Sequence, residues 1–124
     1  MILALVLQNI LADQIDTEIN TGAGTSNLKF ETSGDAEVAT IDFQNPAFGA
    51  AAAGVITLLG VTLSDTSATG GTTVQASIFD RDGTKQLEMT VGTSGTEIII
   101  TSTVIAATEQ VDLTALTITV PTGP

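Results

Sequence analysis

Residues 74–91, VQASIFDRDGTKQLEMTV, carry the clearest folding signal in the chain. Apolar and polar side chains alternate on both sides of a short polar break, which is the pattern of two strands that each bury one face. The break contains Asp82 and Gly83, and glycine supplies the positive φ that a tight hairpin turn needs. The stretch therefore predicts a β-hairpin whose two apolar rows face the same side.

The same two-residue period continues on both sides of this hairpin. It predicts five more strands, at residues 27–31, 39–43, 55–63, 98–104 and 111–120. Residues 55–63 are apolar on both parities, as in a strand covered on both faces. In residues 111–120 the apolar parity changes near Ala115, which predicts a bulge or a strand that changes sheets. Seven short strands with Gly- and Ser-rich turns predict a mainly β fold, an antiparallel β-sandwich or a jelly-roll-like barrel.

Residues 2–19 show a different period, that of an amphipathic α-helix. Its apolar row advances in steps of four residues through Leu3, Leu7, Leu11, Ile15 and Ile19. The polar residues Asn9, Asp13 and Asp16 lie off this row, as an amphipathic helix requires. The first two turns are apolar almost all round, so we expect another surface, such as a neighbouring subunit, to cover them.

The chain therefore divides into an N-terminal helix and anchor, residues 1–24, and a β-sandwich domain, residues 25–124. Glycines within residues 20–24 end the helix. Leu3, Leu7 and Leu11 are the candidate contact residues of the anchor.

The charge of the chain argues against two classes of partner. The formal net charge is −11, from 14 acidic and 3 basic side chains among 124 residues. Such a protein is repelled by nucleic acid and by anionic membrane surfaces, so we expect neither as a partner. The apolar N-terminal stretch has no basic residue before it and is interrupted by Gln8 and Asn9. We therefore expect neither a signal peptide nor a membrane-spanning helix.

The sequence offers no residue set that is typical of a catalytic or metal site. It contains no histidine and no cysteine, which excludes the usual general base and thiolate ligands. Asp80 and Asp82 resemble the start of a calcium loop, but Val91 stands where that motif needs a glutamate, so a hairpin turn is the better interpretation. Lys29 and Lys85 are expected to reach solvent, which leaves no serine–lysine pair. We predict a non-enzymatic protein with no catalytic residue, cofactor or metal.

Residues 44–60, QNPAFGAAAAGVITLLG, contain a run of small residues. A helix is disfavoured there because Gly49 and Gly54 bracket the run, and each costs about 1 kcal/mol inside a helix. We expect a turn at residues 45–46 and Phe48 as a plug. Ala51 and Ala52 are expected where another backbone or subunit approaches closely. These three residues join the candidate contact set.

The amino-acid sequence of this region resembles those of small proteins encoded in the structural modules of tailed phages and prophages. The similar segments are residues 39–57, 90–95 and 116–121, and the order of a short helix before a β domain is also similar. The resemblance implies a virion structural protein, with a capsid decoration (cement) protein at capsomer junctions as the leading interpretation. The chain departs from that group in the strand at 74–77, where an aromatic residue is expected.

The resemblance also implies partners and a location. The partners would be the major capsid protein or other virion subunits, together with further copies of the chain, a trimer being favoured. The protein would then reside in the virion, after assembly in the host cytoplasm.

Two alternatives remain open at this point. One is a protein associated with the tail, collar or fibre, and the other is a carbohydrate- or receptor-binding β-sandwich module. Loops rich in Thr, Ser and Asp, at residues 64–73 and 92–97, favour a binding module, whereas the presence of only 4 Phe as aromatics argues against sugar stacking. Phe79 lies on the polar parity of its strand. It is either an exposed contact residue or is covered by a second sheet or the helix.

Overall fold

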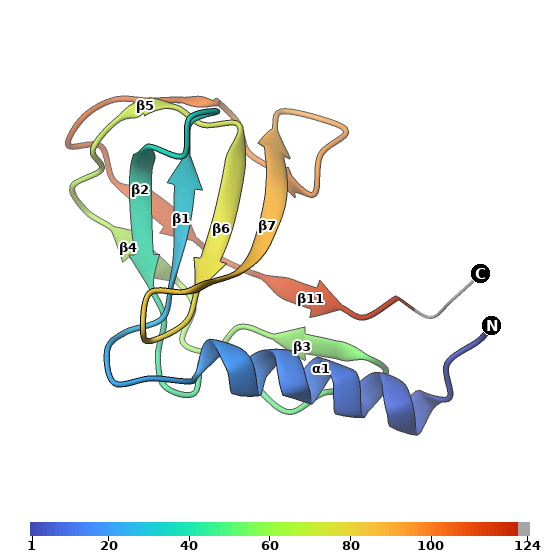
Figure 1. The fold of residues 1–124 in the computed structure, drawn as a ribbon. Coiled ribbons are helices and arrows are strands. Elements are labelled where there is room, and N and C mark those ends of the chain that lie inside the picture. The colour runs from blue at the N-terminus through green and yellow to red at the C-terminus, as the bar shows by residue number, and fades with distance from the viewer. Residues whose placement is uncertain (122–124) are drawn as a thin grey trace.

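A computed structural model describes residues 1–121 and shows a mainly β fold with one N-terminal helix (Figure 1). The helix is α1 (Leu5–Ile19). The strands are β1 (Asn27–Glu31), β2 (Glu37–Asp42), β3 (Val55–Thr57), β4 (Leu63–Asp65), β5 (Gly71–Thr72), β6 (Gln75–Phe79), β7 (Lys85–Gly92), β8 (Ile98–Ile99), β9 (Val104–Ile105), β10 (Val111–Leu113) and β11 (Thr117–Thr119).

The predicted hairpin forms the centre of the main sheet. β6 and β7 pair in antiparallel fashion, and Ile78 lies opposite Leu87 while Ala76 lies opposite Met89. The two apolar rows therefore face the same side, as expected from the alternation. Gly83 adopts a φ of 84° in the turn between the strands, which is the left-handed conformation that favours glycine.

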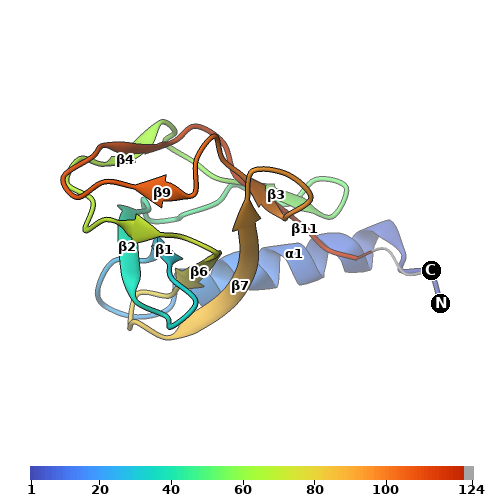
Figure 2. The same ribbon diagram turned by 90° about the horizontal axis from the view of Figure 1, so that it is seen from above.

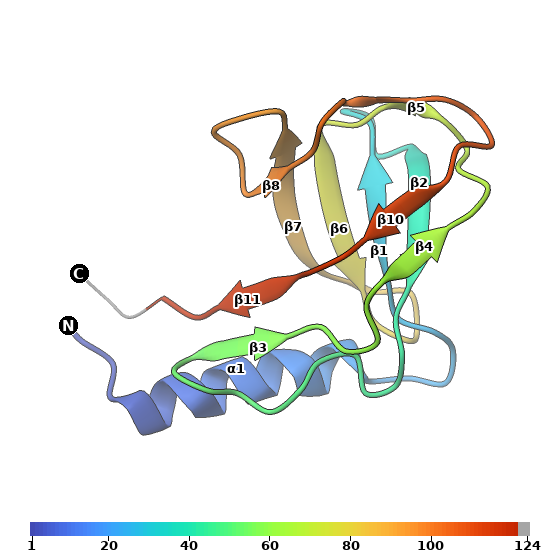
Figure 3. The ribbon, with the colours of Figure 1, turned by 180° about the vertical axis from the view of Figure 1, so that it is seen from behind.

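Five strands in the order β2-β1-β6-β7-β8 build a sheet that curls into a half-barrel. The pairs along it are antiparallel except β7 with β8, which is parallel. Three two-stranded antiparallel sheets, β10-β4, β11-β3 and β5-β9, accompany it. Figure 3 shows β10 and β4 side by side across one face of the main sheet, and Figure 2 shows β4 and β9 on the same side of that sheet. The mainly β prediction is confirmed, but the arrangement is a mixed, curled sheet with small partner sheets and not a clear sandwich.

The concave side of the half-barrel holds the core. Leu28 on β1 lies between Ile41 on β2 and Ile78 on β6, and all three side chains are fully buried. A second buried row is formed by Ala39, Phe30 and Ala76. Burying each of the larger side chains stabilises the fold by roughly 1.5–3 kcal/mol, so these two rows contribute substantially to the stability of the half-barrel.

Two predicted strands are wrong in their extent. Residues 55–63 form β3 and β4 with an exposed segment between them, because the chain turns at Gly60, whose φ is 77°. Leu59 and Val61 remain 37% and 44% exposed, so the apolar run does not mark a doubly covered strand. Residues 98–104 likewise yield only β8 and the start of β9.

The parity change near Ala115 marks a change of sheets, which was one of the two expected interpretations. β10, before the change, pairs with β4, whereas β11, after it, pairs with β3. The chain therefore leaves one small sheet and joins another, and this change lets side chains of opposite parity face the protein interior in turn.

Candidate interaction surface

The helix α1 is held to the β body by its polar side, through four side-chain oxygens that we call the polar ladder. Each accepts a hydrogen bond from a backbone N–H of residues 47–54. The pairs are Asn9 with Gly54 (2.8 Å), Asp13 with Ala51 (2.7 Å), Asp16 with Phe48 (3.1 Å) and Asn20 with Ala47 (2.9 Å). The ladder steps by 4, 3 and 4 residues, so its members share one helix face.

The polar ladder satisfies part of the backbone of residues 47–54. Gly49 and Ala52 donate their N–H groups to the carbonyls of Thr57 and Val55, and Ala51 between them donates to Asp13 of the helix. The small side chains let α1 approach closely, since a Cβ added at Gly54 would lie 3.1 Å from the Gln8 side chain. The close neighbour of the small-residue run is therefore α1.

One carboxylate of the ladder is electrostatically perturbed. Burial raises the pKa of Asp16, and the hydrogen bonds from the Phe48 N–H and the Asn20 amide oppose this shift without cancelling it. The Asn20 Nδ2 donates to Asp16 Oδ1 at 2.9 Å, so Asp16 also orients the last member of the ladder.

Although the polar ladder ties α1 to the β body, much of the apolar surface of the N-terminal residues and the first turns of α1 is exposed. We call this exposed aliphatic surface the N-terminal arm. Its members are 40–89% exposed and comprise Met1, Ile2, Leu5, Val6, Leu7, Ile10 and Leu11. Figures 1 and 3 show that the first turns of α1 extend beyond the five-stranded sheet, with β3 and β11 beside them. The buried end of the predicted row is Ile19, which is 0% exposed.

The arm runs into an apolar groove at the open side of the half-barrel, between β7 and β11. This β7–β11 groove has a volume of about 480 Å³, and its aliphatic lining includes Ile15, Leu87, Met89, Ile98, Leu116 and Ile118. A further hollow of about 300 Å³ shares Ile15 and Leu87 with it and is also lined by Leu11 of the arm. Arm and groove therefore form one continuous apolar surface.

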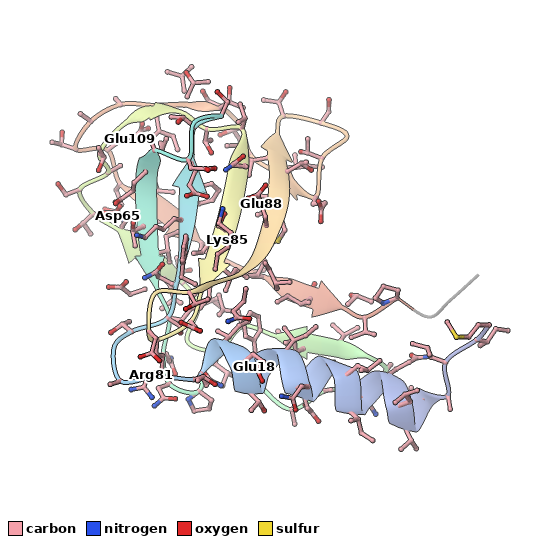
Figure 4. All side chains as sticks on the ribbon, in the orientation of Figure 1. Glu18, Asp65, Arg81, Lys85, Glu88 and Glu109 are labelled. Atoms are coloured by element: carbon pink, nitrogen blue, oxygen red, sulfur yellow. The ribbon has the colours of Figure 1, made fainter. Side chains whose placement is uncertain are left out.

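The outer face of the main sheet holds a buried polar cluster. The Ser77 hydroxyl donates to the Glu31 carboxylate, and the Lys85 ammonium lies 3.9 Å from the same carboxylate. The hydrogen bond from Lys85 to the Glu88 carboxylate raises the lysine pKa. Figure 4 shows Lys85 and Glu88 on this face. The Ser77 hydroxyl is thus partnered by Glu31 and the Lys85 ammonium by Glu88, so the cluster forms an ion-pair network.

The candidate residue Phe79 lies beside this cluster and is partly exposed. The Nζ atoms of Lys29 and Lys85 stand 5.1 Å and 6.0 Å from the centre of its ring. Such cation–π contacts stabilise an exposed site by roughly 0.5–1 kcal/mol. Lys29 and Lys85 therefore lie over the Phe79 ring and cover part of it.

The turn at Asp80 uses its carboxylate within the hairpin. Asp80 Oδ1 accepts the N–H groups of Asp82 and Thr84, each at 2.9 Å, and Oδ2 accepts the Gln86 amide at 2.9 Å. The Thr84 hydrogen bond is the largest cause of the lowered pKa of Asp80. The predicted hairpin turn is thus observed, and no cluster of three or more potential metal ligands occurs in residues 1–121.

The remaining candidate contact residues fall in different places. Phe48 is 1% exposed and packs edge-on against Phe43, with ring centres 5.9 Å apart, so it is not accessible to a partner. Ala51 is half-buried beneath α1, and Ala52 is exposed. Leu3 is half-buried against the core, whereas Leu7 and Leu11 belong to the arm.

Sequence reasoning missed the two features that define this surface. The groove joins residues from β7, β8 and β11, which no local pattern connects. The polar ladder is visible in the sequence as a helical spacing of four polar residues, Asn9, Asp13, Asp16 and Asn20. The same spacing is expected of a helix face that contacts only solvent, so it does not identify the ladder.

Comparisons beyond this chain add no family. No helix of residues 1–121 is long and apolar enough to cross a membrane. No protein-family model, curated protein or solved structure matches the chain. The arrangement of its surface therefore carries the functional argument.

Proposed function

We propose that the chain is a non-enzymatic structural protein of a tailed-phage virion, and that it is a capsid decoration protein bound at capsomer junctions. The observation that carries the proposal is the N-terminal arm, an exposed aliphatic surface on an otherwise acidic β body. Monomeric proteins rarely expose contiguous apolar patches beyond roughly 300–600 Å², and larger patches mark contact sites.

The location of charge is compatible with such a role. Residues 1–12 contain no Asp, Glu, Lys or Arg, so the arm can be buried in a protein interface without desolvating a charged side chain. The acidic body would face solvent on the outside of the shell, away from the packaged nucleic acid. The resemblance to tailed-phage structural proteins supplies the identity of the particle, and its subunits would be the partners.

The test is the composition of the particle. Virions purified from the strain that encodes the chain should contain it in many copies, as measured by quantitative mass spectrometry. Purified particles without the chain would rule out the virion role.

A pair of matched variants tests the arm as the anchor. Val6→Asp places a charge on the arm, where Val6 is 72% exposed, and Val104→Asp places one on β9, where Val104 is 65% exposed. We expect Val6→Asp to be lost from particles and Val104→Asp to be retained. Equal incorporation of both variants would contradict an anchoring role, and binding of either to a glycan array would favour a carbohydrate-binding module.

A further inference from the structure

The N-terminal arm and the β7–β11 groove have complementary shapes on one chain. The arm is a projecting segment with exposed aliphatic side chains on several sides, and the groove is a concave, largely aliphatic surface of about 480 Å³. They meet where Leu11 and Ile15 line the hollow of about 300 Å³. The row of Leu3, Leu7 and Leu11 therefore leads directly into the groove.

The arm is large enough for a stable interface. Its exposed fractions, 40–89%, correspond to roughly 700–800 Å² of accessible area, close to the ~800 Å² that each partner contributes to a standard interface. The groove would be buried in the same contact and would add to this area. Burial of this extent matches a folded protein surface as the occupant and exceeds what a small ligand would cover.

The charge distribution selects among possible protein partners. Each chain carries −11, so two copies repel one another wherever their acidic surfaces meet. A contact through residues 1–12 avoids that repulsion, because these residues have no ionisable side chain. The rim of the groove carries Glu18, Glu88 and Glu97, which disfavours an acidic segment there and tolerates an uncharged one.

We propose that a second copy of the chain covers this surface, with the arm of each copy lying in the β7–β11 groove of the other. In a two-fold contact the same patch is used by both subunits, and residue i of one meets residue j of the other reciprocally. A patch that contains both the projection and the groove satisfies this condition. In the closed pair, Leu7 contacts the wall formed by Leu87 and Ile118 of the other copy.

This pairing differs from the trimer that the resemblance favours. In a cyclic trimer each arm would enter the groove of the next copy, and no two copies would exchange arms. The pairing concerns the free chain in solution, where no capsid subunit competes for the arm. On the particle, a capsid subunit would take the place of the second copy.

Sedimentation equilibrium of the full-length chain tests the stoichiometry. We expect a species of twice the 12.6 kDa chain mass, and Leu7→Asp should weaken the dimer at least about 100-fold, because the change occurs twice in a two-fold interface. Val104→Asp is the matched control and should leave the mass unchanged. Circular dichroism and thermal melting verify that both variants are folded.

Disulfide cross-linking tests the arrangement, since the chain has no native cysteine. Leu7→Cys and Ile118→Cys, prepared separately and mixed, should form a mixed disulfide faster than Leu7→Cys with Val104→Cys. A monomer at high concentration, a trimer mass, a dimer that is insensitive to Leu7→Asp, or equal cross-linking of the two mixtures would each overturn the proposal. A monomer that sediments with phosphatidylcholine vesicles would instead identify the arm as a membrane contact. A negative result here leaves the particle-composition test unaffected.

Discussion

Asp16 is the residue of the polar ladder whose removal should cost the most. It accepts the Phe48 N–H at 3.1 Å and the Asn20 amide at 2.9 Å. Asp16→Ala leaves the Phe48 N–H without its partner beside a side chain that is 1% exposed. An unsatisfied buried donor costs roughly 1–3 kcal/mol. Loss of the Asn20 orientation adds to this cost, so we expect a total of about 2–3 kcal/mol.

Urea denaturation followed by circular dichroism measures this loss. The midpoint should fall at an unchanged m-value, and a change of about 2 kcal/mol corresponds to a decrease in Tm of roughly 6–10 °C. Asp16→Asn is the control, because its Oδ1 can accept the same two hydrogen bonds. We expect its free energy of unfolding to lie within about 0.5 kcal/mol of the wild type at neutral pH.

The pH dependence gives a second, independent check. Burial raises the pKa of Asp16 above its ordinary value of 3.8, so the fold favours the protonated form. The contribution of Asp16 to stability is therefore complete below pH 3.8 and is lost as the pH rises through the pKa of the folded state. Compared with Asp16→Asn, which does not titrate, the wild type should lose stability over this window. An Asp16→Ala loss below about 0.5 kcal/mol, or an equal loss in Asp16→Asn, would refute the ladder as the support of α1.

Further expectations concern the turn, the small-residue run and metal binding. Asp80→Asn should be less stable than the wild type at pH 6–7, and this difference in the free energy of unfolding should disappear as the pH falls below about 3.8. The reason is that the pKa of Asp80 is lowered in the fold, so its contribution to stability is lost on protonation. A difference independent of pH would contradict this. Ala51→Leu should cost about 1–3 kcal/mol by crowding α1, whereas the exposed Ala52→Leu should stay within about 0.5 kcal/mol, and equal urea midpoints would oppose this packing. Ala53→Gly should stabilise the chain by about 0.5–1 kcal/mol, because Ala53 has a φ of 51°, while Ala52→Gly serves as a control that should not. Excess EDTA should leave the melting temperature unchanged, and a decrease of more than about 4 °C would indicate a bound cation.

The elements that sequence patterns predicted well are those whose partners are close in the chain. The hairpin of β6 and β7 follows from alternation and one turn, and its register of Ile78 with Leu87 needs no distant information. The helix is likewise local, although it begins at Leu5 and not at residue 2. Such units can be predicted from sequence because their local patterns agree with the structure that they adopt in the fold.

The parts that could not be predicted depend on which distant segment supplies the other half of a contact. The apolar run at 55–63 is equally compatible with a buried strand and with two short strands at the rim, and only the turn at Gly60 decides between them. The groove requires β7 and β11 to be left unpaired with each other, which is a property of the curl of the sheet. Phe48, expected as a plug, is 1% exposed in the core, and a plug residue and a core residue have the same sequence signature.

The polar ladder and the N-terminal arm have a single structural cause. Residues 47–54 leave four N–H groups, those of residues 47, 48, 51 and 54, to be satisfied by α1, so the helix must present Asn9, Asp13 and Asp16 towards them. The 3.6-residue period then places Leu7 and Leu11 on the opposite side, where they are 42% and 40% exposed. A helix with this orientation is unfavourable for an isolated subunit in water, since its apolar side stays exposed.

The two sets of side chains can therefore be separated by experiment. Asp16→Ala removes a contact within one chain and should lower the stability of the subunit at every concentration. Leu7→Asp changes only an exposed position, 42% accessible, and should lower the free energy of association while leaving the melting temperature of the dilute monomer unchanged. If Leu7→Asp destabilised the dilute monomer as much as Asp16→Ala, the arm would be part of the fold of the subunit, and the surface proposed here would lose its basis.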